Sequence, residues 1–140
     1  MANNEKALRL LGLARHARRL ETGEEPVVIL CRSGKARLVL LASDAGEHTL
    51  RRAENLCRGK NTPLLVAPFG KSELGDALGV NACALCALSD TGFAVSLLQA
   101  MEDCPDAAAL LPQMQQLDGR MRRRREEARA HRSNVKHGKK

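Results

Sequence analysis

A chain of 140 residues is long enough for one domain with a hydrophobic core and too short for two ordinary domains. Two phenylalanines, with no tryptophan or tyrosine, leave the core to aliphatic side chains and nearly exclude RNA recognition by stacking on aromatic rings. The sequence contains no run of 18 apolar residues, so we expect no membrane-spanning helix. We also expect no secretory signal, because the first ten residues lack an apolar segment.

The positive charge is concentrated at the C-terminal end. Residues 1–117 contain 13 Lys and Arg and 13 Asp and Glu, whereas residues 118–140 contain 10 and 3. The last segment therefore carries the whole formal charge of +7. This split predicts a neutral folded body with a basic arm that binds polyanions. Four of the five cysteines lie in apolar segments, which favours buried thiols and a cytoplasmic location.

Helices and strands are predicted to alternate along the first hundred residues. Apolar residues at spacings of three and four, with capping residues before them, predict helices over about 4–18, 24–33, 47–58, 73–78 and 91–101. Short β-compatible runs predict strands over about 19–22, 37–43, 62–69 and 81–88. We expect Ser72 to cap the fourth helix. The alternation indicates an α/β fold, a three-layer α/β/α sandwich, over residues 1–101.

The remaining residues predict a linker and a basic tail. Residues 102–119 contain two prolines and lose the regular apolar pattern, so we expect a linker there. Residues 120–140 form an arginine-rich tail, with seven arginines between Arg120 and Arg132. Its composition favours helix in part, but it lacks an apolar stripe, so we expect it to be undocked and either partly helical or disordered.

No set of residues predicts catalysis. Cys83 and Cys86 have the CxxC spacing of redox and metal sites, but we place both within a strand, where residues three apart point to opposite faces. Core packing is therefore the favoured interpretation. Asp44 and Asp90 follow strands at positions that suit helix caps. Walker loops, nucleophile elbows and dinucleotide-binding glycine patterns do not occur. We predict no enzyme activity, no cofactor and no metal.

Four segments together resemble one family of RNA-binding proteins. They are LLGLARHARRLETGEEPV, RSGKARLVLLASDAGEHT, KNTPLLVAPFGKSELGDALGV and ALSDTGFA. The chain resembles the superfamily of large-subunit ribosomal proteins seven-Ae and thirty-e, and within it the bacterial branch called YlxQ. This resemblance implies a four-stranded mixed sheet of order 1-4-2-3 with an antiparallel last strand. It also implies RNA binding without catalysis. Related domains occur attached to RNA methyltransferases, but no cofactor-binding domain follows here, so an enzyme role is not favoured.

The resemblance implies an RNA site that this chain has altered. The family reads kink-turn RNA with a Gly-x-Asn-Glu-x-x-Lys pattern, whose glycine is Gly23 here. The three reading positions carry Glu25, Pro26 and Ile29 instead. A second family element, the loop after the fourth strand, is Leu88-Ser89-Asp90. We therefore predict that kink-turns are not read in the family's way.

The predicted RNA-binding residues come from the helix start, the loop, neighbouring cations and the tail. They are Gly23, Glu24, Glu25, Lys35, Arg37, Leu88, Ser89, Arg18, Arg19, Arg122, Arg123, Arg124 and Arg125. The predicted partners of this monomeric protein are structured RNA, such as ribosomal RNA, and proteins of the ribosome or translation factors. An alternative is a protein-interaction module of the translation or transcription machinery, because the body is neutral and lacks the RNA-reading side chains.

Overall fold

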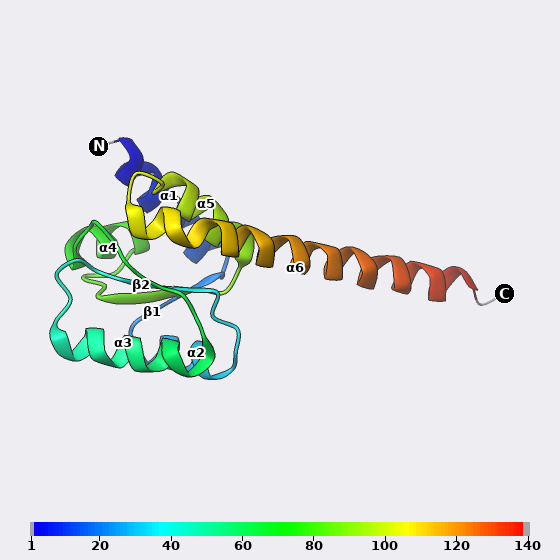
Figure 1. The fold of residues 1–140 in the computed structure, drawn as a ribbon, viewed down its shortest axis with the longest axis horizontal. Helices are drawn as coiled ribbons and strands as arrows, with labels where there is room; N and C mark the ends of the chain where they lie inside the picture. Colours follow the sequence, from blue (N-terminus) through cyan, green and yellow to red (C-terminus); the bar gives the residue numbers. More distant parts are fainter. Residues whose placement is uncertain (1, 139–140) are drawn as a thin grey trace.

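The computed structural model describes the backbone of residues 2–138 (Figure 1). Its helices are α1 (Ala2–His16), α2 (Glu24–Arg32), α3 (Glu47–Lys60), α4 (Lys71–Leu78), α5 (Thr91–Ala100) and α6 (Pro105–Gly138). Its strands are β1 (Leu20–Thr22), β2 (Leu38–Leu41), β3 (Leu64–Val66) and β4 (Leu85–Leu88). The predicted order of elements is confirmed up to α5, although the strands are shorter than predicted.

The four strands form one mixed sheet in the order β1-β4-β2-β3. β2 and β3 are parallel, whereas β4 is antiparallel to both of its neighbours. Leu88 at the end of β4 lies opposite Leu20 on one side and Leu38 on the other. The strand order and the antiparallel last strand are as the family resemblance implies. All residues of β2 and β4 are buried, as expected for central strands covered on both faces.

Helices cover both faces of the sheet, which confirms the three-layer prediction (Figure 1). One face packs against α1, α4, α5 and the first part of α6, in a core that includes Leu11, Leu40 and Leu98. The other face packs against α2 and α3, around Val27, Val39 and Ala53. Aliphatic side chains dominate both cores.

One predicted helix cap is wrong. Ser72 does not begin α4, whose N-cap is Gly70. The cap comes from a residue far away in sequence, since the Lys71 N–H donates to the Asp44 Oδ1 at 2.8 Å. A Cβ at Gly70 would lie only 3.1 Å from this carboxylate, so a larger residue there would require the Asp44 side chain to shift. Asp90 does cap its own helix, because its Oδ2 accepts the Phe93 N–H at 2.9 Å.

The linker expected at residues 102–119 is a helix from Pro105 onward. Pro105 occupies the first helical position, where the missing N–H has no intrahelical partner to lose. Pro112 does lie inside α6 and removes one backbone hydrogen bond. Burial of apolar residues at helical spacing, with Ala107 and Met114 fully inside the core, offsets that loss. The first half of α6 is therefore part of the folded body.

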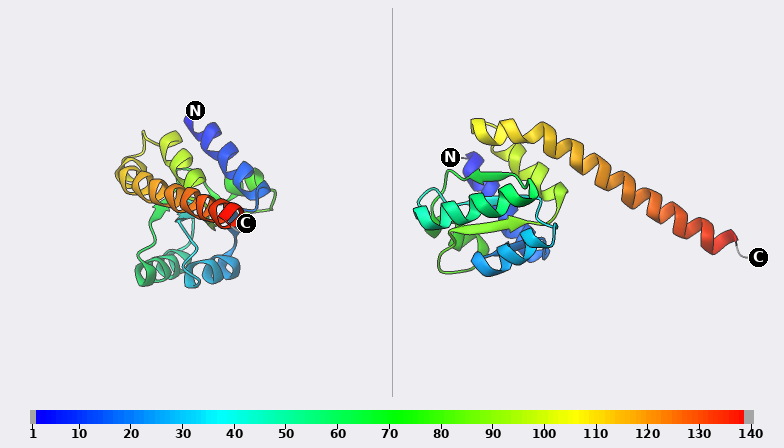
Figure 2. Two further views of the ribbon diagram at one scale, coloured as in Figure 1. Left: turned by 90° about the vertical axis from the view of Figure 1, so that its right-hand side faces the viewer. Right: turned by 60° about the horizontal axis from the view of Figure 1, so that its bottom comes forward.

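The basic tail continues α6 without a break. The helix leaves the body and extends away from it through the arginine-rich segment (Figures 1 and 2). All side chains from Arg122 to Ser133 are exposed. None of the helices in the described part of the chain is both long and apolar enough to cross a bilayer.

The expected placement of the CxxC cysteines on opposite faces is also wrong. β4 begins only at Leu85, so Cys83 precedes the strand and its alternation does not apply. Cys83 and Cys86 are both buried in the same core cluster. The Cys83 thiol donates to the Leu85 carbonyl at 3.3 Å. The neighbouring Cys86 thiol lowers the pKa of Cys83, and the contact with Cys83 together with burial raises the pKa of Cys86. Among the described residues, no group of three metal-ligating side chains is assembled.

Candidate nucleic-acid interface

Most of the predicted cations in the body lie at one end of the sheet. At this end, the Ser89 N–H donates to the Arg19 carbonyl at 2.9 Å, and the Arg37 N–H donates to the Leu88 carbonyl at 2.7 Å. The loop after β4 is thereby fixed between the start of β1 and the start of β2. Arg18 and Lys35 are exposed in the adjoining turns. We call the group Arg18, Arg19, Lys35, Arg37 and Ser89 the basic edge.

Leu88 differs from the other predicted residues at this end. Its side chain is only 2% exposed and belongs to the core. An apolar contact between Leu88 and RNA would require the core to open. The carbonyl of Leu88 instead accepts from the backbone of Arg37, which positions the basic edge.

The predicted helix start lies at the opposite end of the sheet. The Gly23 N–H donates to the carbonyl of Leu85, the first residue of β4, at 2.9 Å. Gly23 has a φ of 91°, in the region that favours glycine, and it begins α2 without a side-chain cap. Glu24 faces Arg52 of α3 at 3.8 Å, with both side chains nearly half exposed. The structure therefore separates Gly23, Glu24 and Glu25 from the basic edge.

A groove along α2 connects the two ends. It has a volume of about 510 Å³ and is lined by Glu21, Glu25, Pro26, Ile29, Leu30, Ser33 and Lys35. Glu25, Pro26 and Ile29, the three positions that the resemblance implies for RNA reading, are all in this lining. Ile29 is 64% exposed, which is unusual for a large aliphatic side chain. Lys35 joins the groove to the basic edge, whereas the remaining lining is apolar or acidic apart from Ser33.

Sequence reasoning missed a second cationic pocket, between α2 and α3. Arg32, Arg52 and Lys60 line it together with Asn55, and its volume is about 460 Å³. Arg52 and Lys60 are eight residues apart, so they differ by about 80° around α3, and both line this pocket. Only the packing of α2 against α3 adds Arg32 to them.

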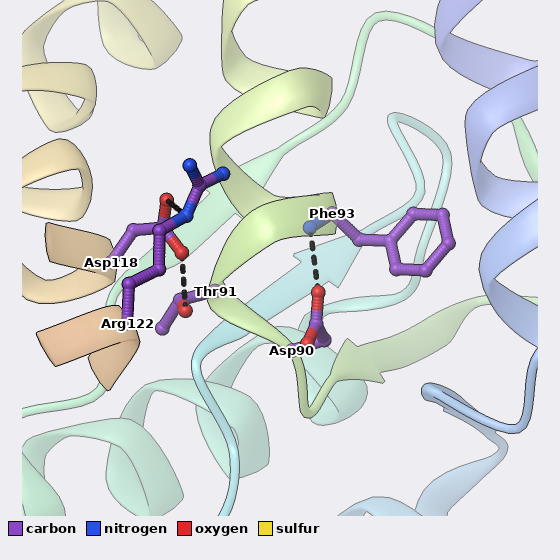
Figure 3. Close-up of polar contacts among 5 residues, drawn as sticks. All are labelled: Asp90, Thr91, Phe93, Asp118 and Arg122. Atoms are coloured by element: carbon purple, nitrogen blue, oxygen red, sulfur yellow. Dashed lines mark hydrogen bonds and ion pairs between the residues drawn. The ribbon is translucent and has the colours of Figure 1, made fainter. Parts of the chain in front are cut away.

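Sequence reasoning also missed the residue that holds the basic arm. The Thr91 hydroxyl donates to the Asp118 Oδ1 at 2.8 Å, and the Arg122 Nε donates to the Asp118 Oδ2 at 3.1 Å (Figure 3). Asp118 is 7% exposed and Thr91 is 2% exposed. Thr91 directly follows the loop Leu88-Ser89-Asp90, so the predicted tail arginines start beside that loop. Arg122 forms an ion pair with Asp118, which lies one helical turn earlier in α6.

A family model and two relatives match most of the body. The model of the "Ribosomal protein L7Ae/L30e/S12e/Gadd45 family" matches residues 5–97. The "RNA-binding protein YlxQ" of Bacillus subtilis is 33% identical over 93 residues, which cover 66% of this chain and 92% of the relative. The protein of the same name from Enterococcus faecium is 31% identical over 100 residues, covering 71% of this chain and 95% of the relative. Both relatives are thus almost fully matched, whereas part of this chain lies beyond the match.

Two solved structures resemble this one. A protein of unknown function from Bacillus halodurans has a TM-score of 0.64 and 38% identity, and the match covers 69% of this chain and 97% of that one. The 15.5 kD RNA-binding protein of Giardia lamblia has a TM-score of 0.59 and 18% identity, covering 76% and 91%, which shows the shared fold alone. Together with the family model, the two relatives show that this chain belongs to the Ribosomal protein L7Ae/L30e/S12e/Gadd45 family.

Proposed function

We propose that this protein is a non-catalytic RNA-binding protein associated with translation or ribosomal RNA. Membership of the family and the two YlxQ relatives, which are named as RNA-binding proteins, support RNA as the partner. The observation that carries the proposal for this chain is the meeting of the basic edge and the arginine-rich arm. The Asp118–Thr91 contact brings the start of the arm to the loop that contains Ser89.

The arm supplies most of the affinity in this proposal. Its exposed arginines, among them Arg122, Arg123, Arg124 and Arg125, neutralise phosphates and release bound counterions. Arg18, Arg19, Lys35 and Arg37 extend the cationic surface onto the body. Such contacts fix the orientation of RNA without reading its sequence. Specificity then comes from RNA shape at the loop and at the helix start.

The salt dependence of RNA binding tests whether the arm supplies most of the affinity. A truncation after Arg122 removes only side chains that are exposed or beyond the described ones, so the body should keep its fold. We expect the full chain to bind structured RNA with a steep salt dependence, and the truncated chain to bind weakly with a shallow one. Fluorescence anisotropy with a labelled ribosomal RNA fragment measures both. Equal affinity and equal salt slope in the two proteins would refute the role of the arm.

Kink-turn recognition in the family's way is not part of the proposal. Glu25 offers acceptors only and repels phosphate, whereas asparagine and lysine would offer donors to guanine edges. Pro26 also removes one of the free N–H groups at the start of α2, which otherwise attract anions. The variant Glu25→Asn with Ile29→Lys should gain affinity for a kink-turn RNA. No gain would show that something other than these two side chains sets the specificity.

Docking of another protein on the α2 groove is the second candidate. The observation that favours it is the exposed Ile29, which lines the groove together with Pro26 and Leu30. Partners captured from a lysate should then survive nuclease treatment and be lost with Ile29→Asp. If nuclease removes every partner, the RNA proposal stands alone.

Location and assembly are part of the same proposal. The five cysteines are all free, which suits a reducing cytoplasm. The family assignment suggests ribosomal subunits or translation factors as the setting, with this protein acting as a monomer. Sedimentation of the protein with ribosomal subunits at low and high salt tests this. A protein that remains in the soluble fraction at both salt concentrations would argue against ribosome association.

A further inference from the structure

The docked face of α6 has a regular period. Its buried members are Ala107, Met114 and Asp118, and Leu110, Leu111, Leu117 and Met121 are partly buried. All of them lie within about 60° of Met114 on a helix with about 100° per residue, so they share one side of it. The side of α6 that faces the body is therefore defined as far as Met121, where the helix leaves it.

The same side continues beyond the body as a row of arginines. Counting about 100° per residue from Met114, Arg132 lies at the same angle, Arg125 within about 20° and Arg129 within about 60°. Arg120, Arg123 and Arg124 lie about 80° to 180° away by the same count. Glu126 and Glu127 lie about 120° and 140° from Met114 by the same count, so neither is on the side that holds Arg125, Arg129 and Arg132. We call Arg125, Arg129 and Arg132 the arginine stripe.

The anchor at Asp118 fixes the direction in which this stripe points. Asp118 lies on the docked side of α6 and accepts from Thr91, so the helix cannot turn about its axis without breaking a buried hydrogen bond. The helix is continuous from Pro105 through the stripe, so the orientation carries over to the exposed part. The stripe thus points to the side of α6 on which the body lies, and Ser89 of the basic edge is two residues before Thr91.

The geometry suits a double-stranded segment of RNA. From Asp118 to Arg132 the helix extends about 21 Å. A straight row of guanidinium groups on a preformed helix matches the regular phosphates of a duplex, and each contact releases counterions. Single-stranded RNA is usually held by aromatic side chains, and this chain has only Phe69, which is buried, and Phe93.

We propose that the arginine stripe of α6 and the basic edge hold an RNA duplex between them, with the stripe on the phosphate backbone. This inference rests on the proposed RNA-binding function and adds the face, the residues and the form of RNA. The other arginines of the arm contribute only general attraction. The arm is then an oriented binding element and its charges are not interchangeable.

Two charge-matched variants of the full chain test the orientation. The stripe variant is Arg125→Gln, Arg129→Gln and Arg132→Gln, and the control is Arg120→Gln, Arg123→Gln and Arg124→Gln. Both lose three charges, and glutamine preserves helix propensity. Binding is measured by anisotropy with a labelled RNA hairpin and with a single strand of the same length. Circular dichroism checks that both variants retain their helix content.

The stripe variant should bind the hairpin at least tenfold more weakly than the control variant. Its log–log salt slope should also fall by roughly 2 to 3, since each phosphate contact in a duplex contributes roughly 0.9. Equal losses in the two variants, or stronger binding of the single strand by the unchanged protein, would overturn the proposal. A failure of the unchanged protein to bind any RNA would instead refute the proposed function.

An insertion provides an independent test with unchanged charge. Two alanines placed after Gly119 rotate the stripe by about 200° away from the body. Hairpin affinity should fall as it does in the stripe variant. Unchanged affinity would show that the direction of the arginines does not matter.

Discussion

Replacement of Asp118 by alanine tests whether a single buried contact holds the arm. The substitution leaves the Thr91 hydroxyl, which is 2% exposed, without its acceptor at 2.8 Å. A buried polar group without a partner costs about 1–3 kcal/mol. The lost ion pair adds only about 0.3–0.5 kcal/mol, because the Arg122 side chain is 68% exposed. We expect the free energy of unfolding to fall by about 2 kcal/mol, with faster hydrogen exchange in α6.

A double-mutant cycle separates this contact from general damage. Thr91→Val removes the hydroxyl and keeps the shape of the side chain, so Asp118→Ala in that background should cost less than in the unchanged protein. Asp118→Asn keeps an acceptor for Thr91 and should cost only about 1 kcal/mol, from the lost charge beside the start of α5. Urea denaturation measures all four proteins of the cycle. A change below about 0.5 kcal/mol for Asp118→Ala, which is about a quarter of the expected loss, or additive effects in the cycle, would refute the reasoning about the anchor.

Three further predictions concern the body. A Cβ on Gly75 would come within 2.8 Å of a backbone carbonyl oxygen, so Gly75→Ala should lower the free energy of unfolding by about 1–3 kcal/mol in urea denaturation. The control Gly59→Ala has open space around the added methyl group in α3 and should raise that free energy by up to about 1 kcal/mol. Similar effects of the two substitutions would contradict the steric argument. Asp44→Ala should cost about 1 kcal/mol by removing the cap of α4, and faster hydrogen exchange confined to that helix would support this. Burial, followed by the charge of Cys31, raises the pKa of the Cys57 thiol to about 12. The folded state therefore holds this proton more tightly than the unfolded state, so stability is present below about pH 9 and decreases from there towards pH 12. Cys57→Ala should flatten this decrease, and an unchanged pH profile would count against it.

Local sequence patterns were sufficient to place the helices and strands of the body in order, because each of these elements is self-consistent. The turn at Gly23 needs a positive φ, and a proline follows in the first turn of α2, where it is harmless. The four-residue strands β2 and β4 are apolar throughout, as central strands require. The strand order came from the family resemblance, which spans these elements.

The same patterns misled where a partner lies far away in sequence. Ser72 looked like a cap, but Asp44 reaches the start of α4 across 27 positions. Prolines suggested a linker, but the apolar face around Met114 packs against the core. The free energy gained by this burial exceeds the loss of one backbone hydrogen bond at Pro112. Cys83 appeared to belong to a strand whose actual start depends on pairing with β2. In each case a contact between distant segments decided the outcome over a local preference.

The sequence by itself determined the layered fold, the neutral body and the basic end. These follow from composition and hydrophobic period, which are local properties of the chain. Only the tertiary structure decided that the helix start and the basic edge lie at opposite ends of the sheet, and that Asp118 directs the arm. Both depend on which surfaces of separate elements meet, and burial and hydrogen bonding across the fold set that.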